Sequence, residues 1–341
     1  MQTREIVKGK FDVNNPMRVG GQAVIEGVMI RAPGMIATAV RRRDGSITIR
    51  TDPYVSLAER TRLFGLPLLR GGVGLVEMLI VGIRTLNTSA ELALIDAEPD
   101  AQESGYTGKA SLRNRATGES LRLSLTVGFA VLVGVAIFFA APLVMTTAFF
   151  HVEQDPLRFN MIAGGSRLML FLGYLTAISF MKDVRRLFEY HGAEHKAVFA
   201  YERGEGLDVA STARQSRFHP RCGTSFLLIV MLVAIVLFGL LDTFLIRLFG
   251  GLTLPLRLAT HLPLIPLVGG VSYEFIRASA RRSGTPLGRI IAAPGLWLQR
   301  ITTKEPDERQ LEVALAALRV ATGGEVTQQK LAPPAQLLVA S

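Results

Sequence analysis

Two of the five histidines in this 341-residue chain, His191 and His195, lie four positions apart, and Glu194 directly precedes the second. On a helix, residues three or four positions apart share a face, so these three side chains would point the same way. Two imidazoles one turn apart can bind one Zn²⁺, and a carboxylate beside them can accept a proton from water at the metal. The H-x-x-E-H spacing therefore predicts a zinc-binding helix, and the plainer interpretation is a surface helix that carries two histidines.

A catalytic zinc requires a third protein ligand, and a second polar motif supplies candidates. His219 and Cys222 lie in the segment FHPRCG, where a proline and a glycine favour a turn just before a long apolar run. Either side chain could complete the site, whereas a site that used both would be closed and structural. The plainer interpretations are a small buried Cys222 and a His219 at the membrane interface near Arg221. Glu202 is the carboxylate alternative for the third ligand if the histidine helix continues that far.

A pair of apolar strands near the N-terminus, bounded by glycines, carries two opposite charges, Glu26 and Arg31. Glycines in such strands permit a close approach of the backbone. The two charged side chains could contact a substrate. The favoured alternative is a structural salt bridge between them on a small sheet.

Other ionisable residues lie in segments that lipid would surround. Glu274 lies near the end of the last apolar segment, His261 lies inside it, and Arg167 lies in an earlier apolar segment. Ionisable groups within a membrane are candidates for function. For Glu274 the favoured alternative is an ion pair with Arg277 on the same helix. For His261 it is a structural role inside the helix bundle.

Four segments are long and apolar enough to be predicted as transmembrane helices, for which about 20 apolar residues suffice. They are residues 121–150, 161–181, 223–246 and 254–276. Lys and Arg gather in the long segments between and beyond these spans and are scarce in the loops 151–160 and 243–253. The positive-inside rule therefore places both termini in the cytoplasm of a bacterial inner-membrane protein.

The rest of the chain divides by composition into six segments. They are a cytoplasmic N-terminal β region (1–62), re-entrant or interfacial helices (63–97), a polar linker (98–120), a cytoplasmic segment with both motifs (182–222), amphipathic cytoplasmic helices (277–322) and a disordered tail (323–341). In the β region, Asp44 and Gly45 favour a two-residue type I′ hairpin turn. In the C-terminal region, Trp297 is expected at the level of the lipid headgroups, and a helix is expected after Pro306.

The composition narrows the class of protein. The formal charge of +10 follows the membrane flanks and lacks interleaved stacking aromatics, so we expect contact with anionic inner-leaflet lipids and no nucleic-acid partner. The single cysteine excludes an internal disulfide framework. The first 16 residues contain no apolar h-region, so no cleavable signal peptide is expected.

Five blocks between Arg18 and Leu318 together resemble a bacterial membrane family typified by YqhQ. They are VGGQAVIEGVMIRAPG, EYHGAEHKAVFAYE, SRFHPRCGTSFLLIVMLV, GVSYEFIR and GLWLQRITTKEPDERQLEVALAAL. The family is uncharacterised, and its members are described as predicted metal-dependent enzymes, so the resemblance implies the same of this chain. Its blocks contain Glu26, Arg31, His191, Glu194, His195, His219, Cys222 and Glu274. One departure is Ala197, where the family often has threonine, and this change removes a hydroxyl but no candidate ligand.

The sequence thus predicts an α-helical polytopic membrane protein with about four transmembrane helices, a small N-terminal antiparallel β element and cytoplasmic helices. The predicted function is metal-assisted hydrolysis of a peptide or lipid at the cytoplasmic leaflet, with Glu194 as general base. One rival is a zinc-stabilised scaffold or assembly factor, in which His219 and Cys222 close the site. A second is a small transporter or channel lined by charged residues of the spans. The substrate, the metal and the oligomeric state, a homo-oligomer included, stay open.

Overall fold

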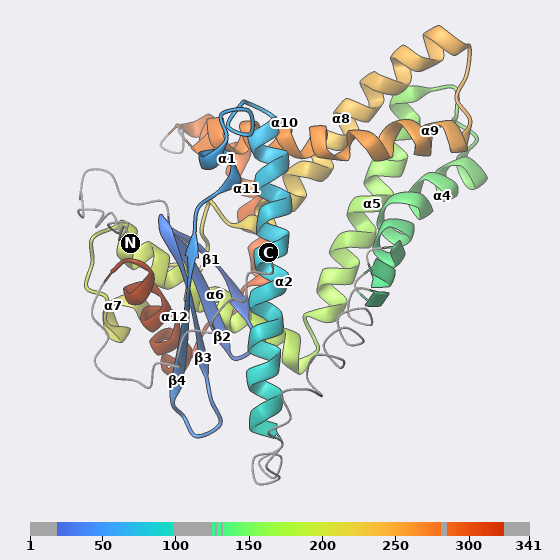
Figure 1. Ribbon diagram of the computed structural model, residues 1–341. Coiled ribbons are helices and arrows are strands. Elements are labelled where there is room, and N and C mark those ends of the chain that lie inside the picture. The colour runs from blue at the N-terminus through green and yellow to red at the C-terminus, as the bar shows by residue number, and fades with distance from the viewer. Residues whose placement is uncertain (1–18, 98–124, 127, 131, 281–284, 324–341) are drawn as a thin grey trace, which may run out of the picture.

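The computed structural model describes residues 19–97, 125–126, 128–130, 132–280 and 285–323 (Figure 1). The predicted polar linker (98–120) lies outside these residues, as does the N-terminal stretch in which no signal peptide is expected. The predicted tail lies outside them as well, apart from its first residue.

A four-stranded antiparallel sheet forms the N-terminal part, with the strands in chain order. The strands are β1 (Gly20–Val24), β2 (Gly27–Ala32), β3 (Gly34–Arg41) and β4 (Ile47–Tyr54). This confirms the predicted small antiparallel β element. Because the order is sequential, β1 and β4 are the two edge strands of the sheet.

The hairpin between β3 and β4 is present, but its turn differs from the prediction. The Gly45 N–H donates to the Arg42 carbonyl at 3.0 Å, and the φ of Gly45 is 83°. A type I′ turn needs positive φ at Asp44 as well, and Asp44 does not adopt it. Its carboxylate instead accepts a hydrogen bond from the Ser46 N–H at 2.9 Å, which stabilises a wider turn that ends in a left-handed glycine.

Helices cover both faces of the sheet and produce three layers (Figure 1). One face packs on α6 (Lys182–Glu202) and α12 (Glu308–Ala321), and the other face packs on α2 (Leu69–Ala97). The alternation of β2 shows this division, because Val28 and Ile30 join the core beneath α6 whereas Met29 joins the core beneath α2. The position after Pro306 fits the predicted helix start, since Asp307 and Gln310 form a capping box there.

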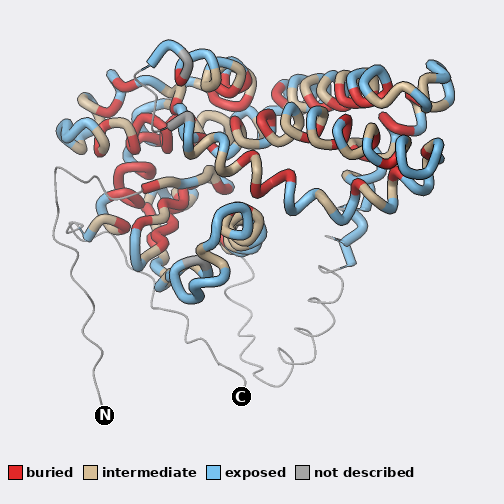
Figure 2. Tube along the Cα trace, turned by 90° about the horizontal axis from the view of Figure 1, so that it is seen from above, coloured by how far each residue is buried: buried red, intermediate tan, exposed pale blue. Residues whose placement is uncertain are grey.

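Four helices are long and apolar enough to cross a membrane, which confirms the predicted fold class. They are Gly128–Phe150, Pro156–Ile178, Gly223–Phe249 and Leu254–Ala278. The first includes the π-helical turn η2 (Ala136–Ala140) and α4 (Ala141–Phe150). The second is α5 (Pro156–Ile178), and the third is α8 (Gly223–Phe249). The last consists of α9 (Leu254–His261), the short η3 (Leu262–Leu264) and α10 (Ile265–Ala280). In Figure 2 the buried positions gather on the inner sides of this bundle and around the sheet.

The region predicted to be re-entrant or interfacial (63–97) follows the short α1 (Leu57–Arg60), and most of it is the single 29-residue helix α2. No re-entrant turn interrupts α2. Two charged residues in its N-terminal half have partners: Arg70 pairs with Glu274 of α10, and Glu77 accepts a hydrogen bond from Ser56 at 2.8 Å. The predicted pair of Glu274 with Arg277 is therefore wrong. The close approach of Gly71 to Tyr273 brings Arg70 to the carboxylate instead.

Asp242 forms a fully buried polar centre inside the helix bundle. It accepts hydrogen bonds from Asn160 of α5 at 2.7 Å and from His261 of α9 at 2.9 Å, and it forms an ion pair with Arg257 at 3.1 Å. We refer to these four residues as the membrane polar cluster. It accounts for His261, which the sequence placed inside the bundle. Arg167 lies elsewhere and donates to the Phe138 carbonyl at 2.9 Å.

Candidate metal centre

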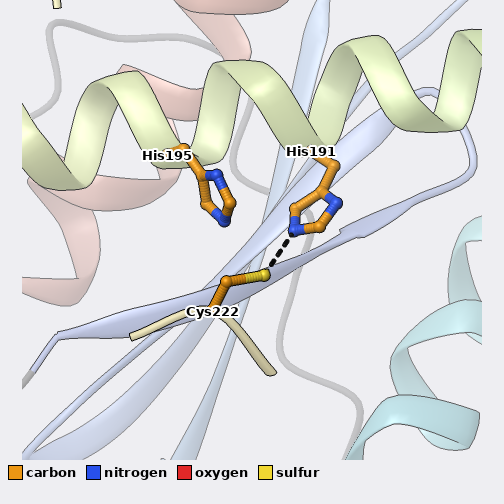
Figure 3. Close-up of side chains that lie close together, drawn as sticks. All are labelled: His191, His195 and Cys222. Atoms are coloured by element: carbon orange, nitrogen blue, oxygen red, sulfur yellow. Dashed lines mark hydrogen bonds between the residues drawn. The ribbon is translucent and has the colours of Figure 1, made fainter. Parts of the chain in front are cut away.

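Three donor side chains converge where α6 meets the turn that precedes α8 (Figure 3). One ligand atom each from His191, His195 and Cys222 lies within 4.8 Å of the others, so the group could hold a metal ion. Both imidazole rings extend from α6 toward the sulfur, and Cys222 Sγ lies 3.3 Å from His191 Nε2. Two motifs 31 positions apart, His191 and Cys222, thus form one site.

Backbone carbonyls fix the orientation of both imidazoles. Nδ1 of His191 lies 2.8 Å from the carbonyl of Thr302, and Nδ1 of His195 lies 2.5 Å from the carbonyl of Arg217. A carbonyl can only accept, so each ring carries its proton on Nδ1. This leaves Nε2 of both rings as the atom that can bind a metal.

His219 and Glu202, two further predicted candidates, lie beside this group and outside it. Nε2 of His219 is 3.3 Å from Glu202, and Arg221 forms an ion pair with the same carboxylate. Burial lowers the pKa of His219, so its ring is neutral at physiological pH. The turn thus divides its two candidate ligands: Cys222 faces the histidine pair, and His219 faces Glu202.

Gln299, which the sequence analysis missed, holds this turn in place. It is fully buried in α11 (Pro286–Thr302), where its amide accepts from the His219 N–H and donates to the His219 carbonyl, both at 2.7 Å. It also donates to Ser225 at 2.9 Å. The sequence did contain a signal for this role: Gln299 lies on the apolar side of an amphipathic helix, and a buried amide requires hydrogen-bond partners. Gln299 is therefore a positioning residue for the turn that carries Cys222.

Glu194 is buried next to the donor group. Its Oε2 lies 3.6 Å from Nε2 of His195. Strand β1 packs directly against it: a Cβ added to Gly21 would lie 2.9 Å from the Glu194 carboxylate. The carboxylate is thus held between β1 and the histidine pair.

The Cys222 sulfur and the His191 imidazole each favour the charged form of the other. Burial raises the pKa of Cys222, but the two histidine rings outweigh burial, and the pKa lies well below its ordinary value. Cys222 is also the N-cap of α8, a position that favours a thiolate. Burial lowers the pKa of His191, but the negative sulfur and Glu194 raise it to about 9. In the metal-free protein at neutral pH, Cys222 is therefore a thiolate and His191 an imidazolium.

The donor group opens into a cavity of about 620 Å³. Helix α6 and the turn before α8 contribute polar residues to one wall of the cavity, namely His191, Glu194, His195, His219, Arg221, Cys222 and Thr224, beside apolar ones of α6. Apolar residues of α2 line the opposite wall, namely Met78, Leu79, Ile83 and Leu86. The edge strand β1 lies between these walls. A molecule in the cavity can therefore contact the donor group and an apolar surface at the same time.

The charges of the N-terminal strands do not pair with each other, so the favoured Glu26–Arg31 salt bridge is wrong. Glu26 adopts φ 53° in the turn between β1 and β2 and forms an ion pair with Arg186 of α6. Arg31 donates to the Tyr54 hydroxyl at 3.3 Å and lines the cavity. The turn separates the two residues because it breaks the apolar stretch into two strands.

Gly192→Ala is expected to lower the free energy of unfolding by about 1–3 kcal/mol, the usual cost of an overpacked site. A Cβ at Gly192 would lie 2.1 Å from the Lys304 carbonyl, and Lys304 is fixed to α6 by a 2.8 Å hydrogen bond from its N–H to Phe188. Thermal unfolding in detergent micelles measures the effect. The matched control is Gly74→Ala in α2, where no atom lies within 4 Å of the added Cβ. Equal melting temperatures for the two variants would contradict the close packing of α6.

Comparison with known proteins places this architecture in a family. The family described as "Protein of unknown function (DUF1385)" matches residues 66–323, which contain all three donors. The "Uncharacterized protein YqhQ" of Bacillus subtilis (strain 168) is 34% identical over 307 residues, which cover 88% of this chain and 91% of that relative. No solved structure matches the chain. The family resemblance drawn from the sequence blocks is confirmed.

Proposed function

This chain belongs to the DUF1385 family, and from the geometry of its own site we propose that it is a metal-dependent hydrolase of the bacterial inner membrane. One observation carries the proposal: the donor group of His191, His195 and Cys222 opens into a cavity beside the buried carboxylate of Glu194. A structural site needs four protein donors and no cavity. Three donors, an open side and a nearby base are what metal-assisted hydrolysis needs.

The donor set fits zinc. Two imidazoles and one thiolate are the ligand types that zinc prefers, and three protein ligands are the usual number in catalytic zinc sites. When bound, zinc supplies a Lewis acid that polarises a carbonyl and makes water more acidic. The carbonyls of Thr302 and Arg217 hold the histidine rings in the required tautomer.

Glu194 acts as the general base in this proposal. It accepts a proton from the attacking water and returns it to the leaving group. Burial between β1 and α6 shields the carboxylate from bulk water. His219 and Glu202 have no direct part in the reaction, since each already engages the other.

The site faces the cytoplasmic leaflet in this proposal, with both chain termini on the same side. The basic residues that flank the four apolar helices support this orientation through the positive-inside rule. They would also attract anionic lipids of the inner leaflet.

The apparent affinity for zinc is expected to rise about tenfold per pH unit between about pH 6.5 and 8.5. The reason is that His191, with its pKa raised to about 9, is protonated below that pH and must lose its proton to bind metal. Cys222 is already a thiolate, so it adds no further proton. Competition with a chromophoric chelator across this range measures the slope. An affinity that does not change with pH would contradict the imidazolium assignment.

A second candidate function is favoured by the same distance of 3.3 Å between Cys222 Sγ and His191 Nε2. A thiolate paired with an imidazolium at a helix N-terminus is the arrangement of a cysteine nucleophile. In that mechanism the sulfur attacks the substrate carbonyl, His191 protonates the leaving group, and water then hydrolyses the thioester and restores the thiolate and the imidazolium. The Thr302 carbonyl would orient the imidazole.

One experiment separates the two mechanisms. Purified, zinc-loaded protein in detergent micelles is incubated with fluorescein-labelled carboxymethylated casein and, separately, with a fluorescent phosphatidylglycerol. The proposal expects hydrolysis that stops when a chelator removes the metal and resumes when zinc is returned. Hydrolysis that survives the chelator but stops after alkylation with iodoacetamide would establish the cysteine mechanism instead. Hydrolysis of neither substrate would contradict both.

The two other functions considered from the sequence have less support. A closed zinc scaffold would use His219 as a fourth ligand, but Nε2 of His219 faces Glu202. A transporter would need a shared polar path, but Glu274, His261 and Arg167 each have a different partner.

A further inference from the structure

Among the residues that the structure describes, no strand pairs with the outer edge of β1. In the two-residue hairpin, Val24 and Gly27 form the hydrogen-bonded pair that closes the turn. Because the backbone groups of an antiparallel strand alternate in direction, those of Gln22 and Gly20 also face β2. The N–H and C=O groups of Gly21 and Ala23 therefore point away from the sheet. Within the described part of the chain, neither residue makes a hydrogen bond beyond the β1–β2 ladder. Gly21 is also exposed, although helices cover both faces of the sheet.

Helix α2 closes one end of this edge. At the turn, the Ile25 N–H donates to Ser89 of α2 at 3.1 Å, so the helix covers the edge there. Further along, the Gln22 side chain reaches α2 by donating to Thr85 at 3.1 Å. Gly20 to Ala23 then line the cavity that holds the donor group. The edge therefore leads from α2 directly to the candidate metal centre.

The cavity has the position of a fifth strand. The sheet lies between the layer of α6 and the layer of α2, and these two helices also form the opposite walls of the cavity beyond β1. A strand added there would lie about 4.8 Å from β1. Its alternate side chains would point toward the donor group of α6 and toward the apolar wall of α2.

We propose that the substrate of this site is an extended polypeptide segment that binds as an added strand along the free edge of β1. Main-chain hydrogen bonds to Gly21 and Ala23 would hold the segment, and the apolar residues of α2 would accept every second side chain. A lipid acyl chain has no donors or acceptors for these backbone groups. The segment would then run directly past the donor group.

This inference rests on the proposed function and specifies its substrate class. The reaction is the hydrolysis of a peptide bond. Water adds to the carbonyl carbon, Glu194 takes a proton from that water, and the carbon–nitrogen bond breaks as the amine receives the proton. The second proton of the water also passes to the amine, so the products are a carboxylate and an ammonium group, and water is the only co-reactant.

Binding is tested without chemistry in Glu194→Gln protein in detergent micelles, with fluorescein-labelled carboxymethylated casein as the probe. Ala23→Pro, added to this background, removes an outward N–H that bonds nothing within the sheet, and proline is tolerated at such edge positions. It is expected to weaken casein binding at least tenfold. The matched control Ala23→Ser keeps the N–H and is expected to bind within about twofold of the parent.

A second measurement does not depend on how well the proline variant folds. Hydrogen exchange of the Glu194→Gln protein is expected to show slower exchange of the Gly21 and Ala23 amides when casein is present. Unchanged exchange together with equal binding by the Ala23→Pro and Ala23→Ser variants would overturn strand addition. Binding of fluorescent phosphatidylglycerol but not of casein would also overturn it and would assign a lipid to the cavity.

The two proposals fail in different ways. If casein binds and protects both amides, but zinc-loaded wild-type protein releases no new amino termini, the hydrolase proposal fails and strand addition stands. If the wild-type protein hydrolyses the phosphatidylglycerol ester while the two amides stay unprotected, strand addition fails and the hydrolase proposal stands.

Discussion

Protein purified from membranes is expected to carry about one zinc ion per chain, and Cys222→Ser and His191→Ala are each expected to lose it. Cys222 supplies the thiolate, the only negative ligand of the donor group, and His191 is the ring nearest to it. Loss of either leaves two donors, too few to retain zinc during dialysis, so we expect more than ~100-fold weaker binding. Elemental analysis of dialysed protein measures the metal content.

His219→Ala is the matched control for this experiment. His219 lies three positions before Cys222 in the same turn, but its ring faces Glu202. We therefore expect this variant to keep its metal. Loss of zinc from His219→Ala as completely as from Cys222→Ser would indicate a four-ligand site, and the scaffold function would replace the hydrolase. Wild-type protein that binds no metal even after reconstitution would contradict both metal functions.

Glu194→Gln is expected to slow hydrolysis by about 10²–10⁴-fold while the zinc content and the melting temperature stay close to those of the wild-type protein. The amide has the shape of the carboxylate but cannot accept a proton from water. Because Glu194 is not in the donor group, the metal should remain. Hydrolysis of labelled casein and of the phosphatidylglycerol ester, measured beside zinc content, tests both parts.

Glu189→Gln on the same helix provides the comparison. Glu189 binds Gln310 and lies outside the cavity, so its conversion to an amide should leave the rate within about twofold. If Glu194→Gln hydrolyses both substrates as fast as Glu189→Gln does, Glu194 is not the base. If Glu194→Gln instead loses its zinc, the carboxylate acts as a ligand.

The membrane helices could be predicted because each is formed by one continuous run of mostly apolar residues. The charge-free stretch before Phe150 and the apolar stretch after Cys222 are long enough to cross a bilayer whatever their neighbours are. The shared face of His191 and His195 was predictable for a similar reason, since one helix turn fixes it. Local periodicity was sufficient in both cases.

The choice between Cys222 and His219 was not predictable, because it depends on a distant helix. Both side chains lie in one turn, and which of them faces the histidine pair is set by Gln299, 80 positions beyond His219. The partner of Glu274 is a similar case, since Arg70 lies 204 positions away. The chain contains many arginines that could pair with Glu274, and the packing of α2 against α10 determines that Arg70 does so.

The membrane polar cluster has a consequence for biogenesis. A charged residue at the centre of a lone helix costs about 2.5–3.5 kcal/mol when it leaves the translocon for lipid. Asp242 of α8 and Arg257 of α9 lie nearer the ends of the last two spans, so each alone would incur part of this penalty, but as an ion pair 3.1 Å apart they cancel one another's charge. The last two spans are therefore expected to enter the bilayer together, as a helical hairpin. The folding of this bundle thus begins at the moment of insertion.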